Sequence, residues 1–128
     1  MSFTTIFYIG FGGALGAILR SFTNGFVSKI FPNLSFPLGT LSVNIIGGFF
    51  IGFLMSLASN INIDINLKSF LVTGFLGGLT TFSTFSYENM LLLQSGNYTN
   101  AFLNIASNLL LSLLFCYFGF WIVKVMYA

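Results

Sequence analysis

The sequence predicts an all-α integral membrane protein with four transmembrane helices. Of its 128 residues, 56% are hydrophobic and only 5% are charged, whereas about 25% of the residues in a soluble domain are charged. A helix needs about 20 apolar residues to cross a bilayer, so this length fits four spans with short connections. We expect a single membrane domain with spans at residues 3–27, 38–58, 67–93 and 101–126.

The first span combines small residues with a single arginine. Gly12 and Gly16 are four residues apart, so they share one helix face and let another backbone approach closely. Arg20 follows one turn later. Because a buried arginine is costly in lipid unless it is paired or reaches the interface, we expect Arg20 to anchor the helix at the membrane surface or to pair with Glu88 or with exposed carbonyls.

The second span follows a proline-bounded turn at residues 31–37 and contains a polar residue, Asn44. This asparagine lies about two turns inside the span, and its amide offers two N–H donors and an acceptor. Two roles are open for it, because an amide at this depth can hold helices together or line a pathway.

The third span contains the most unusual segment, residues 74–88. Three glycines open it, five hydroxyl residues fill Thr80 to Ser86, and Glu88 closes it. Glycines loosen a helix, and the freed carbonyls and the hydroxyls need a partner other than lipid. We therefore expect this helix to break near its middle, beside a pathway for a ligand or an ion.

The residues after the glycines indicate what such a pathway could accept. Phe82 and Phe85 are three residues apart and share a helix face, with Ser83, Thr84 and Ser86 beside them. Positive ring edges and hydroxyl donors suit a small desolvated anion. A glycine-rich break also exposes carbonyl oxygens, which form sites for hard cations. Composition alone leaves both an anion and a cation open.

The fourth span carries one polar stripe on an otherwise apolar helix. Asn104, Asn108 and Ser112 recur at intervals of four residues, which places them along one face. This spacing predicts that they line the same pathway.

The charges give the chain no preferred orientation in the membrane. Arg20 and Lys29 flank one side of the predicted bundle, and Lys68 and Lys124 flank the other, so the positive-inside rule has no asymmetry to act on. No internal repeat is evident. We hypothesise that the chain inserts in both orientations and pairs antiparallel with itself, which would supply an inverted symmetry that one chain lacks.

Three motifs resemble those of the Fluc/CrcB fluoride channels, in order and over nearly the whole chain. The motifs are residues 77–86 with Glu88 in the third span, residues 39–47 in the second, and residues 12–17 with Arg20 in the first. The resemblance implies a multi-pass channel of the cell inner membrane that passively exports fluoride and so lowers its toxicity. It further implies an antiparallel homodimer with two pores and a central structural Na⁺.

The resemblance also implies roles for individual residues. Backbone carbonyls of Gly77 and Thr80, from both subunits, would hold the Na⁺. Because an ionised Glu88 would repel an anion, we expect Glu88 and Arg20 to have a structural role or to lie at a pore mouth. The fourth-span stripe departs from the tyrosine or serine that is common in the family. The implied fluoride pathway consists of Asn44, Phe82, Ser83, Thr84, Phe85, Ser86, Asn104, Asn108 and Ser112.

Other functions fit the sequence less well. A small proton-coupled multidrug antiporter, also a four-helix dual-topology dimer, needs a membrane-embedded carboxylate, and Glu88 is the only acid within a span. A holin-like or structural subunit would not require the polar stripes. The chain lacks histidine and has one cysteine, Cys116, which excludes a His/Cys metal site and an intrachain disulfide. It also lacks catalytic pairs and enough positive charge to bind nucleic acid.

Overall fold

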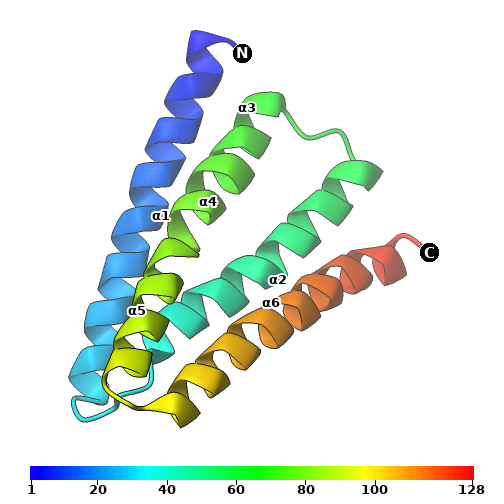
Figure 1. Ribbon diagram of the computed structural model, residues 1–128. Helices are drawn as coiled ribbons and strands as arrows, with labels where there is room; N and C mark the ends of the chain where they lie inside the picture. The colour runs from blue at the N-terminus through cyan, green and yellow to red at the C-terminus, as the bar shows by residue number, and fades with distance from the viewer.

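The computed structural model describes all 128 residues as helices joined by short connections (Figure 1). The all-α prediction is confirmed, since the structure contains no strand. Three helices are long and apolar enough to cross a membrane, and the third predicted span is divided into shorter pieces. The elements are α1 (Phe3–Ile30), α2 (Leu38–Asn60), α3 (Ile65–Lys68), η1 (Ser69–Leu76), α4 (Gly77–Leu79), α5 (Ser83–Gln94) and α6 (Tyr98–Met126).

Several helices extend beyond the apolar stretches that predicted them. The α1 helix continues to Ile30 instead of ending at residue 27, and α6 begins at Tyr98 instead of residue 101. Polar caps set two of the helix starts. The Ser2 side chain accepts a hydrogen bond from the Thr5 N–H at 3.2 Å, and Asn97 accepts one from the Asn100 N–H at 3.3 Å. These caps satisfy N–H groups of the first turn, which have no partner within the helix.

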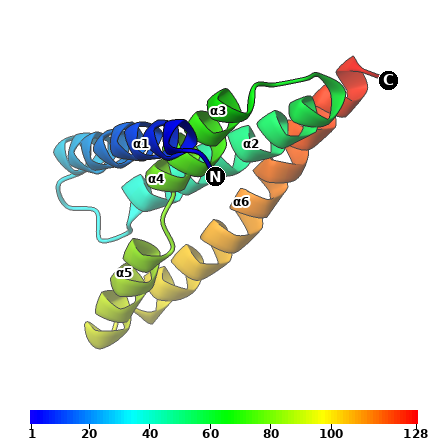
Figure 2. The same cartoon turned by 90° about the horizontal axis from the view of Figure 1, so that it is seen from above.

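The third segment breaks near its middle, as the glycines predicted. The α4 helix ends at Leu79, and the next residue, Thr80, has an extended backbone with φ −82° and ψ 158°. The α5 helix begins at Ser83. Figure 2 shows α5 leaving the line of α3 and α4 in a new direction. Before the break, η1 is a π-helix, a wide and rare turn that frequently occurs at functional sites. No pattern in the sequence predicted this wide turn.

The helices pack as two close pairs, α1 with η1 and α4, and α2 with α6 (Figures 1 and 2). Glycines permit the close approach in both pairs. A Cβ atom on Gly12 would meet the carbonyl oxygen of Phe70, and one on Gly52 would meet that of Cys116. Small residues therefore hold the backbones near one another, as the spacing in the first span predicted.

Little of this chain is buried. Only 21 of the 128 residues are buried, and the buried apolar residues that contact one another form one small cluster of Val43, Leu76 and Leu79. Most large apolar side chains point outward instead. Their surface is suited to lipid or to another chain, because it would be costly in water.

Candidate functional site

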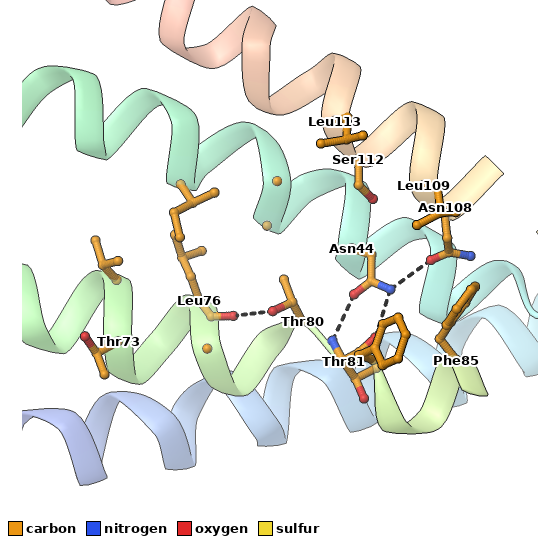
Figure 3. A pocket seen from close by; sticks show the side chains of 16 residues that line it. Asn44, Thr73, Leu76, Thr80, Thr81, Phe85, Asn108, Leu109, Ser112 and Leu113 are labelled. Carbon is orange, nitrogen blue, oxygen red and sulfur yellow. Dashed lines mark hydrogen bonds between the residues drawn. The ribbon is translucent and has the colours of Figure 1, made fainter. Parts of the chain in front are cut away.

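A cavity of about 760 Å³ lies beside the break, between α2, the third segment and α6 (Figure 3). It brings together residues that lie far apart in the sequence, from three of the four predicted spans. Among its lining residues are seven that the sequence singled out, namely Asn44, Gly77, Thr80, Phe82, Phe85, Asn108 and Ser112.

Asn44 joins α2 to the broken segment. Its Oδ1 accepts a hydrogen bond from the Thr81 N–H at 2.9 Å, and its Nδ2 donates to the Thr81 carbonyl at 3.1 Å (Figure 3). The same Nδ2 donates to Asn108 Oδ1 at 2.8 Å. Asn44 therefore pairs with Thr81 as a neighbouring peptide group would. Because both of its N–H groups are engaged, it has no spare donor in this arrangement.

The break deprives several carbonyls of their usual helical donors, among them those of Gly77 and Thr80. In a continuous α-helix, the Thr81 N–H would bond to the Gly77 carbonyl and the Thr84 N–H to the Thr80 carbonyl. Here the Thr81 N–H bonds to Asn44, and the Thr84 N–H bonds to Thr81 Oγ1 at 3.1 Å. The carbonyls of Gly77 and Thr80 are thus freed by side chains that capture those donors.

These carbonyls are suited in kind to a hard cation, which prefers oxygen ligands. No group of three or more His, Cys, Asp or Glu residues forms in the structure. The two residues for which the sequence resemblance implied Na⁺ binding, Gly77 and Thr80, both line the cavity. The Thr80 hydroxyl donates to the Leu76 carbonyl at 3.0 Å.

Phe82 and Phe85 form an aromatic pair with different surroundings. Their ring centroids are 5.4 Å apart, with an angle of 43° between the planes. Phe85 is 7% exposed, whereas Phe82 is 73% exposed. The Phe85 ring is therefore buried in the cavity wall of this chain, while most of the Phe82 ring is exposed and could contact lipid or another chain.

The polar stripe of α6 divides into two parts. Asn108 and Ser112 line the cavity, and the Ser112 Oγ is buried without a hydrogen-bond partner. Asn104 does not line it. This side chain is fully buried and bonds to Asn89 and Asn108. Ser112 is therefore the residue of the stripe with a free donor at the cavity.

The other hydroxyl residues of the third segment lie outside the cavity lining. Ser86 donates to the Phe82 carbonyl on its own helix at 2.9 Å, and the exposed Ser83 lies 3.4 Å from Thr81 Oγ1. The backbone of Thr84 is capped by Thr81. Within one chain, the structure does not bring Ser83, Thr84 and Ser86 to the cavity.

Glu88 lies in a different place from the cavity residues. Its Oε1 accepts a hydrogen bond from the Thr40 hydroxyl at 2.7 Å, and its Oε2 is buried without a partner. It borders a smaller cavity of about 290 Å³ near the α1–α2 connection. No ion pair joins Glu88 to Arg20, and Arg20 is half-buried.

The structure adds two residues that the sequence did not single out, Thr81 and Asn89. Asn44 binds the broken segment at Thr81. Nothing in the sequence distinguishes Thr81 from the hydroxyl residues beside it. Asn89 is 6% exposed and donates to the Phe85 carbonyl at 2.9 Å. Its position one turn after Phe85 and next to an apolar run was the available signal.

Known proteins resemble this chain over almost its full length. The profile of a family described as CrcB-like protein, Camphor Resistance (CrcB), matches residues 7–120. Proteins named fluoride-specific ion channel FluC from Campylobacter jejuni (strain RM1221) and Campylobacter lari are each 55% identical over 120 residues, which cover 94% of this chain and 98% of theirs. A FluC protein from Sulfurimonas denitrificans is 46% identical over 125 residues, 97% of this chain and 96% of its own.

Proposed function

The chain belongs to the CrcB family, and from that premise we propose that it is a fluoride-selective channel that passively exports fluoride through the cell inner membrane. The observation that carries this proposal is the cavity at the helix break. It joins the phenylalanine pair to Asn44 and to the unpartnered hydroxyl of Ser112. This function accounts for a polar, interrupted segment in a membrane helix.

The chemistry of the cavity supports an anion as the permeating species. A pore for a strongly hydrated ion must replace its water with protein groups while it stays too narrow for larger ions. The Ser112 hydroxyl and the edges of the Phe82 and Phe85 rings are donors of this kind. The cavity lining contains no carboxylate, so nothing in it repels an anion by charge.

The exposed side of α5 supports a second chain as part of the pathway. Phe82, Ser83 and Ser86 are all exposed in one chain, although polar groups in a membrane need partners. We propose that an antiparallel homodimer covers them and forms two pores. In each pore Ser83, Thr84 and Ser86 would continue the path, and Asn104 would support it from behind Asn108.

A structural Na⁺ at the dimer centre is a further part of the proposal. Its ligands would be the Gly77 and Thr80 carbonyls, which Asn44 and Thr81 deprive of their helical donors. The ion would offset these carbonyl dipoles and add positive potential beside the fluoride paths.

Fluoride release from liposomes tests the function. Purified protein is reconstituted in potassium fluoride vesicles, and fluoride is followed outside with an electrode after a potassium ionophore is added. We expect rapid release of fluoride but retention of chloride in matched vesicles. A lack of release, or release only when protons are exchanged, would contradict the channel, and the second result would favour the antiporter.

A further inference from the structure

Four asparagines form a continuous chain of hydrogen bonds that leads from the cavity to the contact between α5 and α6. Asn44 donates to Asn108 at 2.8 Å, and Asn108 donates to Asn104 Oδ1 at 2.7 Å. Asn104 donates to Asn89 Oδ1 at 3.0 Å, and Asn89 donates to the Phe85 carbonyl at 2.9 Å. We call these four residues the amide ladder. Three of them, Asn89, Asn104 and Asn108, are buried.

The two ends of the amide ladder fix the direction of every amide in it. At one end, the Phe85 carbonyl can only accept, so Asn89 must turn its NH₂ group toward it and its oxygen toward Asn104. At the other end, the Thr81 N–H can only donate, so Asn44 must present its oxygen there. Reversing any amide would bring two oxygens or two N–H groups together at sites where an unpaired polar group is costly.

The direction of the amide ladder decides how Asn44 meets the broken segment. With its Nδ2 directed to Asn108 and to the Thr81 carbonyl, its Oδ1 is left for the Thr81 N–H. That last bond is the one that takes the donor away from the Gly77 carbonyl. A residue at the far end of the ladder therefore influences both the cavity wall and the break.

We propose that Asn89 is a positioning residue for fluoride conduction, acting through the amide ladder on the orientation of Asn44. This inference rests on the proposed function. Asn89 does not line the cavity, so it would not touch the ion. Because the ladder consists of neutral amides, it orients groups beside the pathway without placing a charge there.

Two substitutions separate the hydrogen bonds of Asn89 from its packing. In Asn89→Leu, a side chain of similar size makes neither bond, and the buried Asn104 NH₂ loses its acceptor. In Asn89→Ser, the hydroxyl can donate to the carbonyl four residues earlier and its oxygen can accept from Asn104. Asn60→Leu is the matched control. Asn60 Nδ2 also donates to the carbonyl four residues earlier, that of Ser56, at 2.8 Å, but Asn60 lies outside the ladder.

Fluoride release from liposomes is then compared for equal amounts of each protein of unchanged oligomeric state. We expect Asn89→Leu to slow release at least about tenfold, because a cost near 1.4 kcal/mol corresponds to that factor. Asn89→Ser should stay within about threefold of the wild type, and Asn60→Leu should match it. A wild-type rate in Asn89→Leu, or equal loss in the serine and leucine variants, would overturn the proposal.

A spectroscopic measurement tests the amide ladder even if Asn89→Leu does not fold. In protein labelled with ¹⁵N-asparagine, the side-chain amide resonance of Asn44 is assigned from its absence in Asn44→Ala. We expect it to shift in Asn89→Ala, which removes both bonds of Asn89, and to stay in place in Asn60→Leu, although Asn89 and Asn44 share no hydrogen bond. An unmoved resonance would refute the ladder. Since this result does not depend on fluoride transport, it remains informative if the wild type fails to conduct.

Discussion

At the residue scale, Asn44 and Ser112 contribute to the cavity in different ways. Asn44 makes three hydrogen bonds, two of which hold the Thr81 peptide. Ser112 makes none through its hydroxyl, although this oxygen is buried. Asn44 therefore maintains the shape of the site, and Ser112 has a hydroxyl donor that no other protein group uses. The two should be separable by measuring stability and flux in the same variants.

The substitution Asn44→Ala should lower both stability and flux. It removes three hydrogen bonds and leaves the buried Oδ1 of Asn108 without a donor, so we expect a loss of about 1–3 kcal/mol in unfolding free energy. Because Asn44 no longer binds the Thr81 peptide, the break should lose its shape. Fluoride release from liposomes should then slow about tenfold or more. Asn60→Ala is the control. Wild-type flux in Asn44→Ala would contradict this role.

The substitution Ser112→Ala should lower flux without lowering stability. The hydroxyl has no partner to lose, so removing it should leave the thermal unfolding temperature unchanged or slightly raised. Fluoride release should nevertheless slow, because the cavity loses its free hydroxyl donor. Ser107→Ala on the same helix is the control, since the Ser107 hydroxyl bonds only to the Leu103 carbonyl. Equal flux in the two variants would show that the path does not use Ser112.

The sequence indicated most of the polar and aromatic residues of the cavity but not their separate tasks. Asn44, Phe82, Phe85, Asn108 and Ser112 do lie together. Spacing alone could not distinguish Asn104 from Ser112, because four residues turn a helix about 40° beyond one full turn. The stripe therefore winds around α6, and its first member meets α5 instead of the cavity. The role of Asn89 could not be predicted, since its partner lies on another helix.

At the element scale, the helices are positioned by glycines at specific contacts. The carbonyl of Phe70 lies where a side chain on Gly12 would begin, whereas nothing surrounds Gly10 on the same helix. Sequence spacing predicted that α1 would pack closely through such a face. It did not predict that the partner would be the π-helical η1, because that wide turn has no distinct sequence pattern.

A matched pair of alanine substitutions tests this packing. We expect Gly12→Ala to destabilise the protein, since the new Cβ would force α1 away from the Phe70 carbonyl. Gly10→Ala has open space and should be neutral or stabilising by up to about 1 kcal/mol, because alanine favours helices. Thermal unfolding in detergent measures the difference. If Gly12→Ala were as stable as Gly10→Ala, close packing of α1 on η1 would not matter.

At the scale of the whole molecule, composition predicted the helical class, but the assembly could not follow from one chain. The charges are balanced across the two sides, and most of the apolar surface points outward. If the chain has no preferred orientation, C-terminal topology reporters should register both sides of the membrane in similar amounts. Adding lysines beside Lys124 should bias the result to one side. A single orientation in the unmodified chain would exclude the antiparallel dimer.

The freed carbonyls lead to a prediction about sodium. If Na⁺ sits on the Gly77 and Thr80 carbonyls at the dimer centre, protein prepared and assayed without sodium should release fluoride more slowly, and restored sodium should recover the rate. Potassium or a large organic cation provides the control. Rates that are the same in every cation would contradict a sodium site at the break.

The small buried core also has a consequence for gene dosage. Because few of its residues are buried within one chain, each conducting unit of the proposed dimer would be completed only when two chains meet. While chains are sparse in the membrane, the number of such units would grow with the square of the number of chains made. A cell that halves its expression would then lose about three quarters of its protection, so modest changes in transcription would produce steep changes in resistance.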